Sequence, residues 1–376
     1  MKRIIILLLC LTMLLGGCGT KQPEPTQPPQ TQPATELATE PTTEPTTVPT
    51  TEATTVPTTV ETEPIYLYRH PLTGEALMDP MLTRPVAVII NNISAAQPLH
   101  GIGAADILCE ITAEGGGTIT RLLGIFTDLE AAGKIGSIRS ARTYMIDLAR
   151  AFDAPLVHCG YSEYARDEIR KTKYPSFNEF SYGKYFYRDE ARRKAGYALE
   201  HTLFADGEDL LKGLLNNGFE MTIAEDREYG LQFMDEVILD GQSAKEITFR
   251  FYSEGGKRTV MTYDETDGVY YGTQKWKSKT KNFTDTNTGE DVPFKNVLLL
   301  YSKTTTDGYR MFADLTGEGT GYYACGGQIV PIKWYREKNT DPFSYTLEDG
   351  TLLTLAVGKT YMGIIPTRYP NIDIVG

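Results

Sequence analysis

The stretch RPVAVIINN, residues 84–92, is a continuous apolar run that begins at an Arg-Pro pair and ends at two asparagines. Three similar runs follow it, at residues 106–111, 119–126 and 155–159. Their apolar residues occupy consecutive rather than alternate positions, which is typical of strands that are covered on both faces. We therefore expect these four runs to be strands of a central, largely buried sheet.

Helical periodicity appears between and after these runs. Residues 140–152 place their apolar side chains along one face, and residues 206–215 form a second such segment that stops at Asn-Asn-Gly. Strands mixed with helices predict an N-terminal α/β domain with a mixed sheet, which we assign to residues 65–230.

The pattern changes after about residue 230. Short segments with period-two alternation are separated by Gly, Asn or Asp turns, as in ITFRFYS, VYYGT, NVLLLYS, QIVPIKWY and TLLTLAVG. This pattern predicts a mostly antiparallel β domain over residues 231–376. The expected fold class is thus α+β or α/β. The folded part has about 310 residues, which is more than one hydrophobic core usually supports, and its length therefore also favours two domains.

The N-terminus has the layout of an export signal. Lys2 and Arg3 precede an apolar run, residues 4–15, that is too short to span a bilayer. The run ends in Leu-Gly-Gly-Cys, which resembles the lipobox of bacterial lipoproteins, and so we expect removal of residues 1–17 and lipidation of Cys18. The alternative is an ordinary signal peptide followed by an unmodified cysteine.

Lipid on Cys18 would hold the chain on the outer, extracytoplasmic face of the cell membrane. Two or more acyl chains, such as palmitate, make a stable anchor. Residues 18–64 are almost entirely Thr, Pro, Glu and Gln after the cysteine, a composition that cannot bury a core. This segment is predicted to be a disordered spacer, either a tether with a reach of roughly 40 Å as a random coil or a glycosylated stalk.

The net charge argues against one class of partner. The chain has a net charge of −12, and its folded part is also acidic, which argues against binding of nucleic acid.

The cysteines do not indicate a metal site. Cys109, Cys159 and Cys325 show no metal-ligand spacing, and we favour buried free thiols over a disulfide bridge between Cys109 and Cys159. We expect no metal and no other cofactor.

Long segments of the chain resemble the YerB-like lipoproteins, a bacterial family whose domain has no established function. The resemblance is carried by RPVAVIINN, GIGAADILCEITAEGGGTITRLLGIF and KIGSIRSARTYMIDLARAFDAPLVHCG, and continues through GTGYYACGGQIVPIKWYRE. The chain departs from the family pattern at Cys109 and Cys159, which argues against a chemical role for either thiol. The resemblance implies an architecture and a location, but no reaction.

The segment IGSIRSAR, residues 135–142, is the main candidate binding site. It leads into the predicted helix, so that Arg139, Ser140 and Arg142 lie at a helix start whose free N–H groups favour an anion. Arg121 lies among apolar neighbours on a strand and needs an acceptor, for which Glu110 is the first candidate and Glu114 the second. A purely structural Glu–Arg network is the alternative.

Three side chains are candidates for acid–base chemistry. Glu110 and Glu114 are embedded in or next to apolar strand residues, which raises a carboxyl pKa. His158 lies at the carboxyl end of the fourth apolar run, where open α/β sheets place ligand contacts; a core histidine is the equal alternative. A segment rich in Tyr and Phe, residues 161–204, suggests glycan contact or simple packing.

We therefore predict an envelope-associated binding or assembly lipoprotein with an arginine-lined anion site. The ligand would be an envelope glycan or an anionic polymer. One alternative is a hydrolase or transferase that acts on an anionic envelope substrate, although no zinc-protease, serine-nucleophile or redox-cysteine motif is present. Another is a protein–protein interaction or signalling lipoprotein. The sequence does not predict the oligomeric state.

Overall fold

The computed structural model describes residues 68–114, 118–252, 256–277, 279–368 and 372–376. The predicted signal peptide, Cys18 and the spacer lie outside the described residues. The described residues, which begin at Tyr68, form one compact unit. No helix among the described residues is long and apolar enough to cross a membrane.

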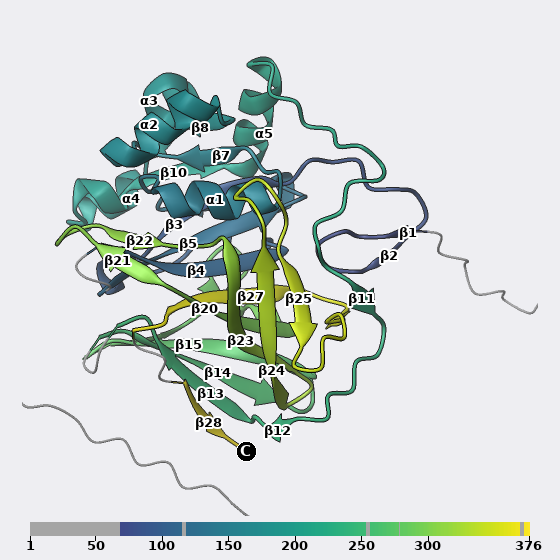
Figure 1. The fold of residues 1–376 in the computed structure, drawn as a ribbon. Helices are drawn as coiled ribbons and strands as arrows, with labels where there is room; N and C mark the ends of the chain where they lie inside the picture. Colours follow the sequence, from purple (N-terminus) through teal and green to yellow (C-terminus); the bar gives the residue numbers. More distant parts are fainter. Residues whose placement is uncertain (1–67, 115–117, 253–255, 278, 369–371) are drawn as a thin grey trace, which may run out of the picture. The chain divides into compact units, whose positions relative to one another are not determined.

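A large mixed sheet of eleven strands runs through this unit (Figure 1). It is mixed because β3, β5 and β4 pair antiparallel, whereas β4–β27–β20 and β3–β7–β8 pair parallel. In spatial order its strands are β12 (Gln242–Ser243), β24 (Gln328–Arg336), β23 (Gly317–Cys325), β20 (Asn296–Ser302), β27 (Thr360–Pro366), β4 (Ile107–Glu114), β5 (Ile119–Phe126), β3 (Val86–Asn92), β7 (Leu156–His158) and β8 (Ser176–Asn178), with β25 (Ser344–Leu347) also paired to β24.

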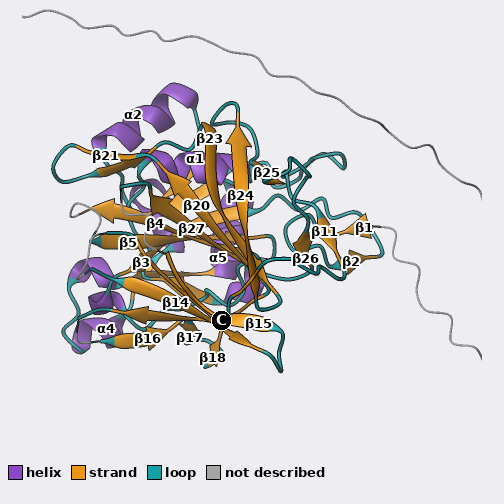
Figure 2. Cartoon of the chain, turned by 60° about the horizontal axis from the view of Figure 1, so that its bottom comes forward, coloured by secondary structure: helices purple, strands orange, loops and turns teal. Residues whose placement is uncertain are grey.

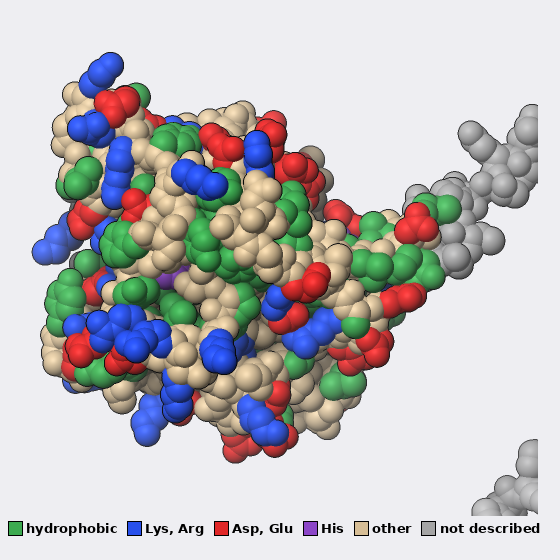
Figure 3. Space-filling view, turned by 90° about the horizontal axis from the view of Figure 1, so that it is seen from above, with side chains coloured by type: hydrophobic (Ala, Val, Ile, Leu, Met, Phe, Trp, Pro, Cys, Tyr) green, Lys and Arg blue, Asp and Glu red, His purple; other side chains and the backbone are tan. Residues whose placement is uncertain are grey.

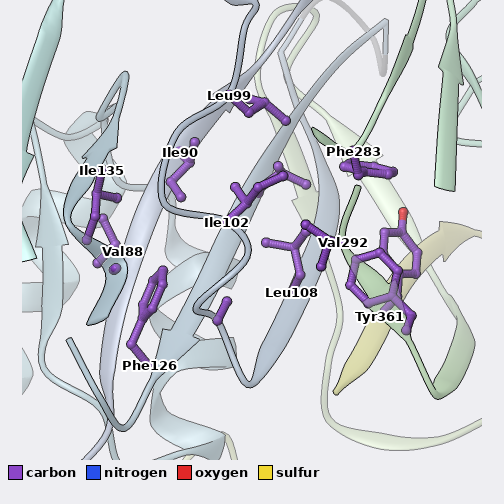
Figure 4. Close-up of a cluster of buried hydrophobic side chains, with 14 of the residues drawn as sticks. Val88, Ile90, Leu99, Ile102, Leu108, Phe126, Ile135, Phe283, Val292 and Tyr361 are labelled. Carbon is purple, nitrogen blue, oxygen red and sulfur yellow. The ribbon is translucent and has the colours of Figure 1, made fainter. Parts of the chain in front are cut away.

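The apolar runs are strands because both faces of this sheet are covered. Val88 and Ile90 of β3 point into one hydrophobic cluster, and Ala87 and Ile89 point into another on the opposite face. Figure 4 shows part of the first cluster. Because consecutive side chains of a strand point to opposite faces, all five apolar residues of β3, 86–90, lie in one core or the other.

Smaller elements cover the sheet. A second, antiparallel sheet adds its apolar positions to the first cluster, and helix α1 adds its own to the second. The second sheet is made of β16 (Thr280–Asn282), β15 (Val269–Lys275), β14 (Arg258–Asp264), β13 (Glu246–Arg250) and β28 (Ile372–Val375), with β19 (Pro293–Phe294) paired to β15, and a third of β6 (Lys134–Gly136), β10 (Leu203–Asp206) and β9 (Tyr187–Arg188).

The remaining elements are helices and two-stranded pairs. Besides short 3-10 helices, the described residues form the α-helices α1 (Thr143–Ala151), α2 (Glu163–Thr172), α3 (Glu179–Tyr182), α4 (Glu190–Lys194) and α5 (Gly207–Asn216). The pairs are β1 (Tyr68–Arg69) with β2 (Ala76–Leu77), β11 (Phe233–Met234) with β26 (Leu355–Ala356), β17 (Thr284–Asp285) with β18 (Glu290–Asp291), and β21 (Thr304–Thr306) with β22 (Met311–Ala313).

The predicted mixed sheet and the antiparallel β region are confirmed, but the α/β description of the first region fits only loosely. Strands dominate, and β3, β4 and β5 form an antiparallel group rather than a series of crossovers. Strands from before and after residue 230 share the large sheet, because β27 pairs with β4. The segment TLLTLAVG contributes only the two-residue strand β26.

A substitution at Gly321 of β23 tests the close approach of β23 to the neighbouring strand β20. A Cβ atom at this position would lie 2.2 Å from the backbone oxygen of Leu299 on β20, so the backbone would have to move. We expect Gly321→Ala to lower the free energy of unfolding by about 1–3 kcal/mol, as measured by urea unfolding of the full chain. Gly183→Ala is the control, since a Cβ there meets no atom within 4 Å; equal effects of the two substitutions would contradict this account.

Candidate functional site

The segment IGSIRSAR reaches α1 in an extended conformation. Ala141 donates its N–H to the oxygen of Gly160 and its carbonyl accepts from Ser162, so the chain stays extended until Arg142. Helix α1 therefore begins at Thr143, three residues later than predicted, with Arg142 as its N-cap residue. No side chain caps this N-terminus and its first turn has no acidic residue, which leaves it suited to an anion.

Arg121 and Arg142 share one carboxylate, that of Glu114. Nη2 of Arg121 donates to Oε1 and Oε2 of Glu114 at 2.6 and 2.9 Å, and Nη2 of Arg142 also contacts Oε1. Nη1 of Arg121 donates to the backbone oxygen of Ser140. The side chains of Arg121 and Glu114 are 1% and 4% exposed, so this ion pair is almost fully desolvated.

A β-bulge brings Glu114 to this face. In the β4–β5 pair Thr112 lies opposite Thr120, but Glu114 lies opposite Ile119, so β4 contains one extra residue. Without this residue, alternation would place Glu114 on the same face as Glu110. The bulge redirects its side chain, as bulges commonly do near functional sites.

The cluster of Arg121, Arg142 and Glu114 has a surplus positive charge, because two guanidinium groups share one carboxylate. Burial, followed by the like charge of Arg139, lowers the pKa of Arg121 to about 10, and burial also lowers the pKa of Arg142. Both groups still carry their charge at neutral pH. The Nε atoms of Arg121, Arg139 and Arg142 are buried and have no hydrogen-bond partner among the described residues.

Arg139 is the arginine with the most solvent access of these three. Its side chain is 22% exposed, and its Nη2 lies 3.4 Å from Oε2 of Glu200, whose side chain is 54% exposed. A fourth arginine, Arg310, follows β21 and forms a backbone bridge with Glu114. Sequence reasoning missed Arg310, since only the pairing of the β21–β22 hairpin next to β4 brings it to this place.

Glu110 does not join the arginines. Because alternate residues of a strand point to opposite faces, Glu110 enters the first hydrophobic cluster, where it contacts Lys257 and accepts hydrogen bonds from Asn92 and Tyr361. The structure therefore separates the two candidate glutamates: Glu114 pairs with Arg121, and Glu110 pairs with a lysine that no sequence motif indicated.

His158 is also separate from the arginines. Its ring is fully buried, with Nδ1 2.6 Å from the backbone oxygen of Gly160 and Nε2 2.7 Å from Oγ of Ser176. Both ring nitrogens are thus occupied within the core. Burial lowers the pKa of His158 to about 4, so the ring is neutral at physiological pH.

The cysteines and many of the aromatic side chains of residues 161–204 are buried or packed against other rings. Cys109 and Cys325 are buried free thiols, and Cys159 is a half-buried one. Much of the aromatic segment packs internally around the buried ring of Phe177, which stacks on Tyr182 at a centroid distance of 4.4 Å. The exposed aromatic side chains of this segment are Tyr161, Tyr164, Phe180 and Tyr187.

Three open clefts on the described surface, with volumes of about 780, 820 and 640 Å³, are lined by none of the sequence-predicted site residues. The described residues contain no group of three His, Cys, Asp or Glu side chains that could hold a metal ion.

On the face seen in Figure 3, basic and acidic side chains are intermixed. On this face, anion recognition would therefore depend on individual side chains rather than on a broad basic surface.

Comparison with known proteins points to one family. Residues 72–220 match the model described as "Protein of unknown function (DUF3048) N-terminal domain", and residues 247–362 match the C-terminal domain of the same name. The chain is 26% identical over 306 residues to "Putative lipoprotein YerB" of Bacillus subtilis (strain 168), covering 79% of this chain and 86% of that protein.

The fold is similar as well. The crystal structure of the YerB protein from Bacillus subtilis superposes with a TM-score of 0.68 at 25% sequence identity, over 82% of this chain and 100% of that chain. The two family models lie on either side of residue 230, although the large sheet draws strands from both regions.

The charge balance around Glu114 predicts a large effect of its removal. Glu114→Gln would leave two buried guanidinium groups without a counter-charge, and we expect it to lower the free energy of unfolding by about 3–5 kcal/mol. Urea unfolding of the full chain measures this change. The exposed Glu190, whose side chain is 62% exposed and pairs with Arg193, is the control; Glu190→Gln should change stability by no more than about 0.5 kcal/mol.

Burial of neutral His158 predicts a pH dependence. The unfolded chain binds a proton near pH 6.5 and the folded chain only near pH 4, so stability rises with pH between these values and is complete above 6.5. The difference corresponds to about 3 kcal/mol. Urea unfolding of the native chain and of His158→Gln from pH 4 to 7 should show a smaller rise for the variant; parallel curves would refute the assignment.

Proposed function

The chain belongs to the DUF3048 family, and we propose that it is a lipid-anchored, extracytoplasmic binding lipoprotein that holds an anionic component of the cell envelope at the arginine cluster. The observation that carries this proposal is the surplus charge: Arg121 and Arg142 share the single carboxylate of Glu114 in a buried setting. Natural proteins seldom leave a buried charge uncompensated, and a bound anion would compensate this one.

The proposed location at the outer face of the membrane rests on the N-terminal segment and on the similarity to a protein named as a lipoprotein. The Leu-Gly-Gly-Cys sequence ending at Cys18 supports lipidation, and the long Thr- and Pro-rich spacer supports display at a distance from the membrane. The similarity to a protein named "Putative lipoprotein YerB" agrees with this location.

The geometry favours binding over catalysis. The two side chains proposed for acid–base work, Glu110 and His158, lie in separate networks from Glu114 and the arginines. An acid or base must reach the proton that it transfers within hydrogen-bond distance or through one water. A hydrolase or transferase reading would therefore require Glu114 alone, whose two oxygens are already engaged by arginines.

A second candidate function is suggested by the groove of about 780 Å³ on strands β23, β24 and β25, which lie side by side (Figure 2). Tyr335 on its floor is 52% exposed, and hydroxyl and charged side chains surround it. Rings and hydroxyl groups of this kind suit a neutral glycan or a protein partner. Further lining residues are Glu318, Thr320, Lys333, Ser344 and Thr346.

A calorimetric titration of the full chain in detergent tests the proposal. The ligands are a purified anionic wall polymer, inorganic phosphate and a neutral glycan. We expect the anionic polymer to bind and Arg139→Ala to weaken its affinity at least about tenfold, the loss typical of one charged hydrogen bond. Arg139 is chosen because its partial exposure makes it less important to folding than Arg121.

Two matched variants make the outcome specific. Arg170→Ala removes an exposed arginine from α2 and should leave the affinity unchanged, whereas Tyr335→Ala should matter only if the groove is the site. Binding of the neutral glycan that is lost in Tyr335→Ala would favour the second candidate. Release of product from the polymer would establish an enzyme instead, and no binding by the folded native chain would refute the anion site.

A further inference from the structure

A lysine, an asparagine and a glutamate meet in the core between the large sheet and the antiparallel sheet. Asn92 ends β3, Glu110 lies in the middle of β4, and Lys257 immediately precedes β14. Asn92 and Glu110 are 0% exposed and Lys257 is 4% exposed. Three residues from distant parts of the sequence are therefore held together out of contact with solvent.

One carboxylate oxygen connects the other two side chains. Oε1 of Glu110 contacts Nζ of Lys257 and accepts a hydrogen bond of 2.9 Å from Nδ2 of Asn92. The amine of Lys257 and the side-chain amide of Asn92 thus contact the same oxygen atom of Glu110. This places a nucleophile, an acyl group and a proton carrier within reach of one another.

Aromatic rings and a few hydroxyl groups surround the cluster, and the hydroxyl of Thr259 accepts a hydrogen bond of 3.0 Å from Nζ of Lys257. Phe251 and Phe283 lie with their ring centroids 5.5 and 5.7 Å from Nζ of Lys257, and Figure 4 shows Phe283 beside Tyr361. The hydroxyl of Tyr361 donates to Oε2 of Glu110 at 2.6 Å. Burial lowers the pKa of Lys257, against the opposing effect of Glu110, which favours the neutral, nucleophilic amine.

The amide of Asn92 is incompletely satisfied. Its Oδ1 is buried and has no hydrogen-bond partner among the described residues, while Nδ2 faces Glu110 and Thr120. Exchange of the two amide positions would direct Oδ1 toward Glu110 and Thr120, and both can donate once Glu110 is protonated. In that orientation the carbonyl of Asn92 is polarised for attack.

We propose that Lys257 and Asn92 become joined by an intramolecular amide bond between Nζ and Cγ, with Glu110 carrying the protons. The bond would link the end of β3 to the start of β14 and so connect the large sheet covalently to the antiparallel sheet. This self-modification is independent of any ligand at the arginine cluster.

The reaction balances without any co-reactant. The Lys257 ammonium gives one proton to Glu110, and the lone pair on Nζ then attacks Cγ of Asn92 while Glu110 protonates Oδ1. Glu110 next takes a proton from Nζ and delivers it to Nδ2, which has to move toward Glu110 as Cγ becomes tetrahedral. The Cγ–Nδ2 bond breaks, ammonia leaves, and the hydroxyl proton returns to Glu110 as the carbonyl re-forms.

The products explain why such a bond would suit this core. One ammonium, one carboxylate and one primary amide become a secondary amide, a neutral carboxylic acid and ammonia. Two buried charges disappear, which removes their desolvation cost. A covalent link between distant residues also restricts the unfolded chain, and unlike a disulfide it does not depend on an oxidising environment.

Mass spectrometry of the full native chain tests the proposal directly. After tryptic digestion we expect one linked peptide pair that contains Asn92 and Lys257, lighter than the sum of its two peptides by one ammonia molecule, and no cleavage after Lys257. Separate peptides with normal cleavage after Lys257 in the folded native chain would overturn the proposal. A pair lighter by one water and linked through Glu110 would overturn it equally.

Variants assign the chemistry. Lys257→Arg keeps the charge but removes the attacking amine, and Glu110→Gln removes the proton carrier; the linked pair should be lost in both. Lys245→Arg is the matched control, because Lys245 is an exposed lysine that pairs with Glu265, and the linked pair should persist. A linked pair that survives in Glu110→Gln would contradict the role of Glu110, and the native chain gives its answer even if a variant fails to fold.

Discussion

Strand β4 carries two carboxylates into a sheet that is covered on both faces. A carboxylate removed from water must be met by cations or hydrogen-bond donors, and β4 meets this need twice, once on each face. Glu114 faces Arg121 and Arg142, while Glu110 faces Lys257. Glu114 therefore links β4 to the neighbouring strand β5 and to the N-terminus of α1, and Glu110 links β4 to the antiparallel sheet, whose strand β14 lies far away in the sequence.

The one-residue bulge in β4 makes this division possible. Glu110 and Glu114 are four residues apart, and a regular strand would direct both to the same face. Their mutual repulsion and the absence of a second cation would then make the core unstable. The extra residue after Thr112 sends one carboxylate to the arginines, so that the proposed anion site and the lysine–asparagine cluster are built on opposite faces of one strand.

The structure separates the candidate residues that the sequence indicated: some of the arginines meet at one carboxylate, whereas His158 lies in a separate hydrogen-bond network. Arg121 and Arg142 meet at Glu114 because the extended segment before α1 is hydrogen-bonded to β3, whereas Arg139 pairs with Glu200 and influences Arg121 only through its like charge. His158 instead has both ring nitrogens occupied by Gly160 and Ser176. Lys257 escaped notice since it follows two glycines and precedes an arginine, a context that normally indicates a solvated turn.

The sequence by itself determined the buried strands, because consecutive apolar residues such as those of VAVII must be covered on both faces wherever they lie. It also determined the approximate extents of α1 and α5, through helical periodicity, and the concentration of arginines before α1. Tertiary structure alone decided which charge meets which. A register shift of one residue reverses the face of a side chain, and neither the bulge at Ala113 nor the pairing of β27 with β4 has a local signal in the sequence.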